Sequence, residues 1–270
     1  MRWFNAMTTP VAVVTGASSG IGRALAKQLD SEGYNLVLCD VNEPALRETQ
    51  SLLKRGSQRV TLDVSKRDAV EAMAADVIAR HGRIDLVINN AGVTVDATIA
   101  EVSMEDFEWL FGINFWGVVY GTKAFLPTML AQREGTIVNL SSVFGMIGFP
   151  RQGTYNAAKF AVRGFTESLW CELDGTGVTA ISVHPGGIKT NIARDARSKA
   201  TAAAKEQLST EFAKVARTTP EEAAAVIMRG VYEKKRRVMI GADAQLIQLM
   251  SRLLPESYPS IIKALDRRPR

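Results

Sequence analysis

Cysteine and histidine are scarce in this chain, with two of each among 270 residues. The cysteines, Cys39 and Cys171, lie far apart in apolar surroundings, no C-x-x-C pair occurs, and the histidines are His81 and His184. This set favours neither a structural zinc site nor a disulfide framework. We therefore expect two buried free thiols and no metal site.

Long apolar runs are also missing, because no stretch of eighteen apolar residues occurs. A membrane-spanning helix is therefore not expected. Residues 1–7 are too short and too polar a segment for a secretory signal, so we expect the cytoplasm as the compartment.

The excess of positive charge does not indicate a nucleic-acid partner. The net charge is +5, and much of the surplus lies in two short runs, 234–237 and 266–270. Runs of this kind are usually solvated loops and chain ends. Nucleic-acid binding needs a basic face interleaved with aromatic residues, and the sequence offers none. The partner we expect is a small molecule.

Apolar segments of strand and helix character alternate along the chain without a linker or a repeat. Strands are predicted at 10–16, 35–40, 58–63, 84–89, 135–141, 177–183 and 236–240, and helices at 20–32, 43–54, 66–81, 103–111, 115–133, 152–174, 220–233 and 243–254. This rhythm predicts an α/β fold, a doubly wound parallel sheet with helices on both faces. We expect a single domain over 1–270, with 1–9 and 242–270 as terminal extensions.

The segment T-G-A-S-S-G-I-G at 15–22 follows a β-branched apolar strand and precedes a helix. N–H groups at such a turn, together with the helix dipole, favour a pyrophosphate. Three glycines alone are as often only a tight turn, but the position between strand and helix favours a binding site. The cofactor-binding candidates here are Gly16, Ser18, Ser19, Gly20, Ile21 and Gly22.

Asp40 stands at the carboxyl end of the second predicted strand, eighteen residues beyond Gly22. An acidic residue at about this spacing is placed to bond the ribose hydroxyls of NAD and to repel a 2′-phosphate. Val41 beside it carries no positive charge. Arg23, in the helix that follows the glycine turn, is expected to be a solvated surface residue. The sequence predicts NAD rather than NADP.

Further motifs complete a series in which the chain from Pro10 to about Gly241 resembles a short-chain dehydrogenase/reductase with a single Rossmann-type domain. They are Asp63-Val64, Asn89-Asn90-Ala91-Gly92, Asn114, Ser141-Ser142, Tyr155-x-x-x-Lys159 and P-G-G-I-K-T at 185–190. The resemblance implies that Asp63 and Val64 hold the adenine. It also implies that Asn90, Ala91 and Gly92 flank the ribose and that Pro185, Gly186, Ile188 and Thr190 close over the nicotinamide amide.

Tyr155 and Lys159 are four residues apart on a predicted helix, so their side chains share one face. Transfer of a hydride to or from a secondary alcohol needs an acid/base for the hydroxyl proton, and a phenol can serve if its pKa is lowered. We expect the adjacent ammonium to favour the phenolate. Lys159 could also hold the ribose hydroxyls.

Ser142 follows an apolar strand and is expected to hydrogen-bond the reacting oxygen across the cleft. A serine at a strand end is by itself more often a turn residue, and the tyrosine and lysine reverse that balance. Asn114 is a poor helix former in an apolar stretch. The resemblance implies that Asn114 holds a water molecule that relays protons from Lys159. Alternatively, Asn114 is a buried residue whose hydrogen bonds are satisfied within the core.

The expected substrate is an uncharged, largely apolar secondary alcohol or ketone, covered by residues 187–218 as a lid. The residues expected to line its pocket are mostly apolar: Val93, Val95, Val143, Phe144, Met146, Ile147, Phe149, Ile188 and Ile192. Arg151 and Lys189 are the two cations that could instead select an anion.

Other functions and the assembly state follow from the same residues. A catalytically silent NAD-binding scaffold or redox sensor is one alternative, and an isomerase or lyase that uses the cofactor transiently is another.

The helices at 103–133 and 152–174 carry apolar residues on more than one side, which predicts a homodimer or homotetramer.

Overall fold

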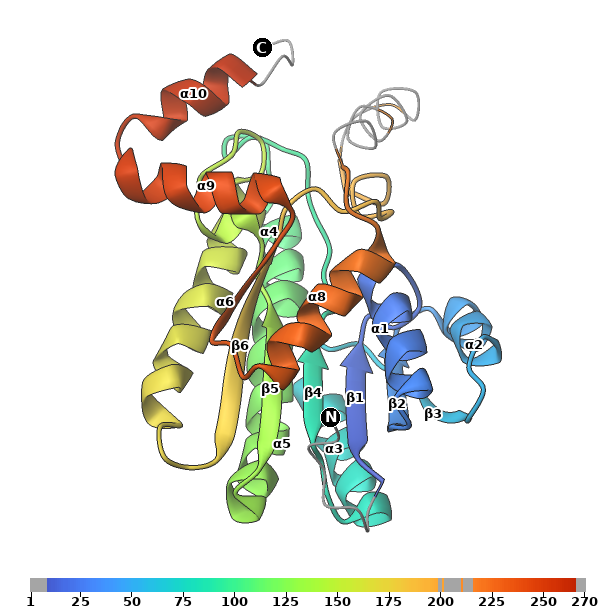
Figure 1. Cartoon of the computed structure of the whole chain (residues 1–270). Helices are drawn as coiled ribbons and strands as arrows, with labels where there is room; N and C mark the ends of the chain where they lie inside the picture. The colour runs from blue at the N-terminus through green and yellow to red at the C-terminus, as the bar shows by residue number, and fades with distance from the viewer. Residues whose placement is uncertain (1–8, 199–200, 202–209, 211–215, 266–270) are drawn as a thin grey trace.

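A computed structural model describes residues 9–198, 201, 210 and 216–265 of the chain. It has three layers, with a parallel sheet between two layers of helices (Figure 1). The seven strands are β1 (Val11–Thr15), β2 (Asn35–Asp40), β3 (Ser57–Thr61), β4 (Leu86–Asn89), β5 (Gly135–Leu140), β6 (Val178–Pro185) and β7 (Arg237–Ile240). The predicted doubly wound α/β sheet is confirmed.

The helices occupy the segments between the strands and beyond the last one. They are α1 (Gly20–Ser31), α2 (Glu43–Ser51), α3 (Arg67–His81), α4 (Met104–Phe111), α5 (Gly117–Gln132), α6 (Gly153–Glu172), α8 (Pro220–Tyr232), α9 (Ala242–Leu253) and α10 (Tyr258–Leu265). A π-helical turn, Gly112–Trp116, joins α4 to α5, and a 3-10 turn, Val143–Gly145, follows β5.

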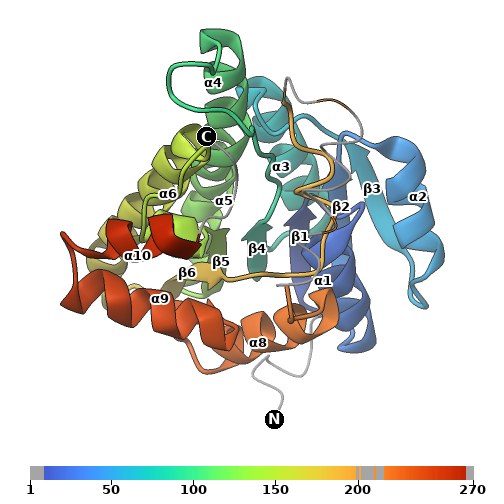
Figure 2. The ribbon, with the colours of Figure 1, turned by 90° about the horizontal axis from the view of Figure 1, so that it is seen from above.

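The strand order is β3-β2-β1-β4-β5-β6-β7, and every pairing is parallel. From β1 the chain adds strands toward β3, and it then crosses to β4 on the other side of β1. This reversal leaves a crevice at the carboxyl ends of the two neighbouring strands, where open α/β sheets bind ligands. Figure 2 looks down on this edge, and the chain after β6 runs across it toward α1.

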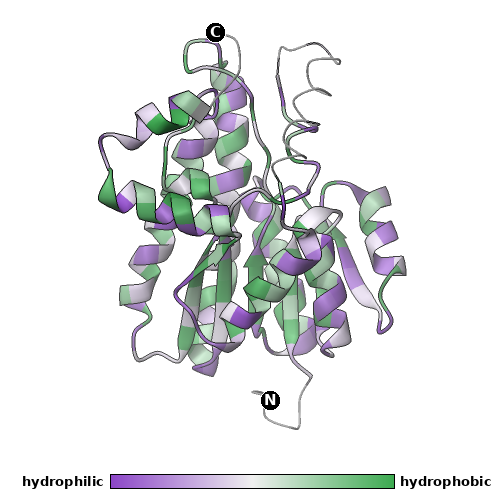
Figure 3. Ribbon diagram, turned by 45° about the horizontal axis from the view of Figure 1, so that its top comes forward, coloured by the Kyte–Doolittle hydropathy of each residue, from purple (hydrophilic) through white to green (hydrophobic). Residues whose placement is uncertain are grey.

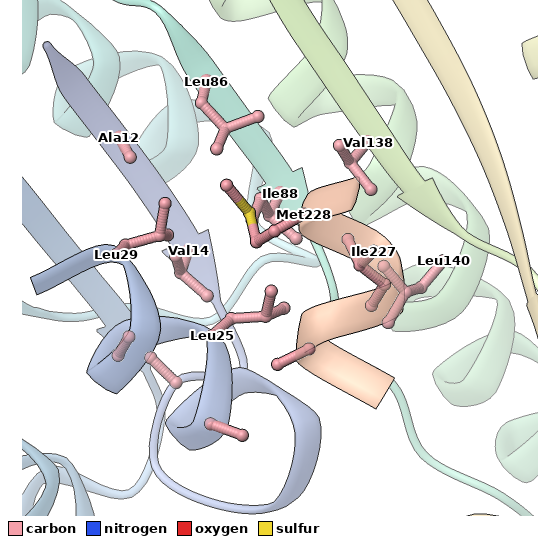
Figure 4. Close-up of a cluster of buried hydrophobic side chains, with 14 of the residues drawn as sticks. Ala12, Val14, Leu25, Leu29, Leu86, Ile88, Val138, Leu140, Ile227 and Met228 are labelled. Carbon is pink, nitrogen blue, oxygen red and sulfur yellow. The ribbon is translucent and has the colours of Figure 1, made fainter. Parts of the chain in front are cut away.

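Two apolar cores lie on the two faces of the sheet, and strands buried on both sides account for their β-branched sequences. One core joins α1 and α8 to the sheet, with Leu25 and Met228 fully buried beside Val14 (Figure 4). The other is built from α3, α5 and α6, with Phe125 and Met129 fully buried. In Figure 3 the apolar residues accordingly concentrate along the central strands, whereas the edge strand β3 is more polar.

Several local predictions need correction or completion. Cys39 is buried as expected, but Cys171 is exposed, because it lies two residues, about 200° of helix rotation, beyond the buried Leu169 of α6. The sequence did not predict α10, the π-helical turn or the 3-10 turn. No helix among the described residues is long and apolar enough to cross a membrane.

The predicted extensions and lid are described only in part. Residues 1–8 and 266–270 lie outside the described residues, as do 199–200, 202–209 and 211–215 of the predicted lid. The helices α9 and α10 of the C-terminal extension lie over the carboxyl edge of the sheet (Figure 1).

Candidate active site

The turn after β1 is packed too tightly for side chains at two of its glycines. A Cβ on Gly16 would lie 2.7 Å from the side-chain nitrogen of Asn90, and one on Gly22 would lie 2.0 Å from the carbonyl oxygen of Gly16. Gly16 also has a φ of +66°, a conformation that L side chains rarely adopt. Close contacts therefore require glycine at both positions, and the backbone conformation is a second reason at Gly16.

Asn90 and Thr15 join the ends of β4 and β1 at this turn. The amide of Asn90 donates to the carbonyls of Thr15 (2.8 Å) and Gly16 (3.2 Å). The hydroxyl oxygen of Thr15 accepts from the backbone N–H groups of Asn90 (3.0 Å) and Ala91 (3.1 Å). Thr15 was not among the predicted site residues, although it opens the glycine motif and ends a buried strand.

The first turn of α1 is open to an anion. Ser19 stands at the N-cap position, but its side chain makes no capping hydrogen bond. The backbone donors of the first turn are thus not satisfied by that side chain, and the positive end of the helix dipole lies with them. The turn fits a pyrophosphate, as the sequence predicted for Ser18 to Gly22.

Asp40, at the end of β2, lies beside the same turn. Its carboxylate accepts from the backbone N–H groups of Ser18 and Asn42, both at 3.0 Å. Arg23 is not the freely solvated residue that we expected, because its guanidinium donates to the Ser18 carbonyl and pairs with Glu48 at 3.0 Å. The Asp40 carboxylate is therefore held in place, and the positive charge of the neighbouring Arg23 is neutralised by Glu48.

Asp63 and Val64 follow β3 on the same edge. The Asp63 carboxylate accepts from the backbone N–H (2.9 Å) and the hydroxyl (2.7 Å) of Ser65. Val64 is buried against Gly117, where a Cβ would lie 2.7 Å from a Val64 methyl carbon. Val64 can offer its backbone to a base, because its side chain is occupied by packing.

Asn114 is fully buried inside the π-helical turn. Its amide exchanges two hydrogen bonds with the backbone of Val93, each 2.8 Å long. A Cβ on Gly92 would lie 3.4 Å from the Asn114 side-chain oxygen and 3.6 Å from the Lys159 ammonium. The structure therefore brings Asn114, Gly92 and Lys159 together, in a turn of a type often found at functional sites.

Ser142 and Tyr155 meet where the 3-10 turn packs against α6. The Ser142 hydroxyl oxygen accepts from the backbone N–H of Phe144 (3.1 Å), and the Ser142 side chain lies close enough to Tyr155 to lower the pKa of its phenol in part. The ring of Phe144 stands edge-on to that of Tyr155, with centroids 6.2 Å apart. The two hydroxyls can thus contact one oxygen atom between them.

Lys159 is almost completely buried one turn along α6, and its ammonium donates to the Leu140 carbonyl at 2.8 Å. The nitrogen lies 5.5 Å from the centre of the Tyr155 ring. Burial lowers the pKa of Lys159 to about 8. The sequence predicted the lysine beside the phenol, and the structure brings them together.

The pKa of Tyr155 is the opposite of what the sequence argument expected. Burial raises it to about 12, while the hydrogen bond from Ser142 lowers it in part. Desolvation of the phenolate is therefore the larger effect, and it opposes the phenolate form that we expected the ammonium to favour. The ammonium is directed at a backbone carbonyl, and its own charge is disfavoured by the same burial.

The segment after β6 passes over the glycine turn. A Cβ on Gly20 would lie 3.1 Å from a methyl carbon of Thr190. Pro185 ends β6, Gly186 N–H donates to the Ile240 carbonyl (2.9 Å), and Ile188 is buried against the α1–α8 core. The Gly187 N–H donates to Asp243 of α9 at 2.7 Å. The sequence had not indicated that α9 contacts this segment.

The predicted pocket residues divide into two groups. Met146 and Ile147 are buried in packing, whereas Phe144 and Phe149 stack on one another with centroids 4.8 Å apart and remain partly exposed near Tyr155. The tail of the chain reaches this loop, where the Gly148 N–H donates to the hydroxyl oxygen of Tyr258 at 2.9 Å.

Two cations, Arg151 and Lys189, could have selected an anionic ligand, and Arg151 is occupied by ion pairs. Arg151 pairs with Asp96 and Glu101, each at 3.2 Å. Lys189 is exposed on the segment after β6. Within the described part of the predicted lid, Arg197 lies 3.6 Å over the Trp109 ring and pairs with Asp106 of α4 at 2.9 Å.

Comparison with known proteins gives consistent matches. A model of a family described as short chain dehydrogenase matches residues 10–201. A candidate oxidoreductase of Mycobacterium tuberculosis, SadH, is 43% identical over 263 residues, which cover 94% of each chain. A solved short-chain dehydrogenase/reductase from Burkholderia phymatum, in complex with NAD, is 32% identical with a TM-score of 0.83, and the match covers 99% of this chain and 98% of that one.

A second solved structure carries the other cofactor type. It is an alcohol dehydrogenase from the archaeon Thermococcus sibiricus, complexed with 5-hydroxy-NADP, and it is 28% identical. Its TM-score is 0.72, and the match covers 86% of this chain and 96% of that one. Similar structures thus hold NAD-type and NADP-type cofactors, and similarity alone does not choose between them.

The lowered pKa of Lys159 predicts that this side chain costs stability. A folded-state pKa of about 8, below the ordinary 10.5, means that folding disfavours the ammonium. The cost is fully present below about pH 8 and disappears as the pH rises to about 10.5. We expect Lys159→Met to raise the free energy of unfolding at pH 7 by about 1–3 kcal/mol, and this gain to shrink toward pH 10.5.

Urea unfolding at both pH values measures the effect, with Lys123→Met at an exposed position of α5 as the matched control. A loss of stability at neutral pH, or a gain that does not change with pH, would contradict the prediction.

Proposed function

This chain belongs to the short-chain dehydrogenase family, and we propose that it transfers a hydride between NAD(H) and the carbinol or carbonyl carbon of a largely apolar secondary alcohol or ketone. The observation that carries the proposal is the meeting of the Ser142 and Tyr155 hydroxyls and the Lys159 ammonium at one edge of the sheet. That edge also carries the uncapped first turn of α1.

NAD(H), when bound, supplies the hydride acceptor or donor. Tyr155 takes the hydroxyl proton when the alcohol is oxidised and returns it when the ketone is reduced. Ser142 donates a hydrogen bond to the same oxygen and stabilises the negative charge that develops there. Lys159 holds the ribose hydroxyls and places positive charge near the phenol.

The raised pKa of Tyr155 fits this assignment if the ligands complete the site. Burial favours the neutral phenol. An ammonium that keeps its bond to the Leu140 carbonyl and donates its other hydrogens toward the ribose, together with the positive ring of the oxidised cofactor, would favour the phenolate. Each pKa unit requires about 1.4 kcal/mol, so two cations in a dry cleft are sufficient to bring the phenol into the working range.

Asn114 completes the proton path in this proposal. Its side chain is satisfied by Val93, so its contribution is through the backbone of the π-helical turn. Such a turn replaces the usual helical hydrogen-bond pattern, and a water bound there would relay protons from Lys159. The other cofactor contacts are those that the sequence predicted, from Gly16 to Gly22, at Asp40, Asp63 and Val64, at 90–92 and at 185–190.

The cofactor preference rests on Asp40. Its carboxylate is fixed by two backbone N–H groups at the end of β2, Val41 beside it is apolar, and Arg23 is paired with Glu48. A 2′-phosphate would therefore meet a fixed negative charge with no compensating cation from these two positions. This arrangement supports NAD over NADP.

The substrate class rests on the walls near Tyr155. Phe144 and Phe149 offer stacked aromatic faces there, and Arg151 is occupied by two carboxylates. A ligand that buries about 150 Å² of apolar surface would gain about 4 kcal/mol before ordering costs.

The segment 187–218 is proposed to cover this pocket as part of a single catalytic domain. A silent scaffold or redox sensor is the alternative, and turnover distinguishes it.

The chain is also proposed to form a homodimer or homotetramer. Trp116, Leu130 and Phe160, which lie on the π-helical turn, α5 and α6, have exposed fractions of 46%, 38% and 42%. Large apolar side chains that share neighbouring helices are typical of a subunit interface.

Tyr155→Phe should abolish nearly all turnover, because the ring still packs against Phe144 but no longer exchanges a proton. We expect a loss of about 10²–10⁴-fold in kcat, with the affinity for NAD within a few-fold of wild type. NADH absorbance measures the rate and calorimetry the affinity. Tyr232→Phe, in the last turn of α8 at a residue that is 36% exposed, is the control. A Tyr155→Phe variant that kept more than about a hundredth of the wild-type activity would disprove the acid/base role.

Asp40 should give NAD at least a tenfold advantage over NADP. Two like charges about 4 Å apart repel by about 4 kcal/mol at an effective dielectric constant of 20, and solvent reduces this value. Asp40→Ser combined with Val41→Arg should shift the preference toward NADP, and Val41→Arg alone separates the effect of the cation. Equal affinities of the wild-type protein for both cofactors, measured by calorimetry, would refute the assignment.

Neutral secondary alcohols should be better substrates than carboxylate-bearing alcohols of similar size, by at least about tenfold in kcat/KM. Ile192→Asp, on the segment that follows β6, should weaken the neutral substrates. The comparison requires matched pairs of alcohols with NAD. Preference for the anionic member, with loss of that preference in Arg151→Ala, would show that the substrate class is wrong.

Trp116→Glu and Phe160→Glu should each shift the protein toward monomer, because a charge on a buried interface is costly. Sedimentation velocity at micromolar concentration measures the assembly. Ile99→Glu, at a residue that is 67% exposed outside these helices, is the control. A wild-type protein that sediments only as a monomer would overturn the proposal.

A further inference from the structure

His184 is a fully buried histidine that the proposed chemistry leaves without a role. It lies on β6, next to Pro185, and both of its ring nitrogens have hydrogen-bond partners. Nδ1 is 3.0 Å from the carbonyl oxygen of Ser142, and Nε2 is 2.8 Å from the hydroxyl oxygen of Ser182. The ring therefore connects the strand to the proposed catalytic serine.

The partners of the ring determine its tautomer. A backbone carbonyl can only accept, so Nδ1 must carry the hydrogen and donate it to Ser142. Nε2 then accepts from the Ser182 hydroxyl. Burial lowers the pKa of His184 to about 4, and the hydrogen bond to the Ser142 carbonyl opposes this shift. Arg237 and Arg163 act in the same direction as burial, and Glu167 acts in the opposite one. The ring is neutral at physiological pH, so this assignment holds there.

The position of His184 in the sheet explains why a side chain is needed. The backbone ladder between β5 and β6 extends to the Ser141 N–H, which donates to the Val183 carbonyl at 2.8 Å. Pro185, at the end of β6, has no N–H group and cannot extend that ladder. The imidazole instead holds the carbonyl of the next residue, Ser142, which has already left the strand.

The segment 140–142 is consequently held at three successive residues. Lys159 Nζ donates to the Leu140 carbonyl, and the Ser141 hydroxyl donates to the Lys159 carbonyl, both at 2.8 Å. The bond from His184 to Ser142 is the third. The first two anchor the segment to α6, which carries Tyr155, and the third anchors it to the sheet.

We propose that His184 is a positioning residue for the proposed hydride-transfer site: its Nδ1–H group fixes the backbone of Ser142 so that the serine hydroxyl stays directed at Tyr155. The inference rests on the proposed function for its kinetic consequence. A hydroxyl that donates to the phenolate favours that form, and a serine that drifts loses both this bond and its contact with the reacting oxygen.

Two substitutions separate positioning from packing. An asparagine at 184 carries an amide N–H close to the position of Nδ1, whereas a glutamine carries its amide one atom farther out. We expect His184→Gln to lower kcat by about 10- to 100-fold, with KM and the NAD affinity within about threefold of wild type. His184→Asn should restore most of the lost rate. His81→Gln, at the other histidine, is the control and should change none of these values.

The pKa of the Tyr155 phenol provides a readout that a merely structural role would not move. Ultraviolet difference titration of the NAD-bound protein against Tyr155→Phe should show that the phenol titrates at higher pH in His184→Gln than in wild type, and that His184→Asn reverses the shift. The acid limb of the kcat profile should move in the same direction. If His184→Gln does not fold, Ser182→Ala, which removes the donor to Nε2, should lower kcat in the same direction by less than tenfold.

The outcomes are distinct. An unchanged phenol titration in a folded His184→Gln protein, or equal losses in the asparagine and glutamine variants, would overturn the positioning role. If the wild-type protein shows no turnover, the proposed function fails, and the titration of Tyr155 still tests the inference.

Discussion

The parallel pairing of β1 with β4 is the constraint on which the candidate site depends. Because the chain reverses direction across the sheet at this pair, Thr15 and Asn90 meet at neighbouring strand ends and bond one another. Their contact leaves space for glycine alone at Gly16 and Gly22. The open first turn of α1 follows directly, so the anion site results from the topology as much as from the motif.

A second set of contacts fixes the segment after β5. Leu140, Ser141 and Ser142 are each anchored, two of them to Lys159 on α6 and one to His184 on β6. Rigid elements hold a reacting group more accurately than a free loop does. The same burial that provides this rigidity raises the pKa of Tyr155 and lowers that of Lys159. Burial thus disfavours both of the charges on which the proposed chemistry depends.

The C-terminal helices add a layer beyond the stretch that the family model matches, which ends at residue 201. Asp243 of α9 accepts from the Gly187 N–H, and Tyr258 of α10 accepts from the Gly148 N–H. These two bonds attach the extension to the segments that follow β6 and β5. The walls on both sides of the proposed pocket are therefore supported by the last part of the chain.

The sequence by itself determined the fold class, the seven strands, all the described α-helices but α10 and the residues that gather at the sheet edge. These follow from local periodicity, glycine spacing and the common direction of parallel strands. It could not determine the exposure of Cys171, the ion pair of Arg23 with Glu48, or the dominant effect of burial on the pKa of Tyr155. Nor could it assign His184 to the Ser142 carbonyl. Each of these depends on which groups distant in the chain become neighbours and on how much solvent they lose, and only tertiary packing decides both.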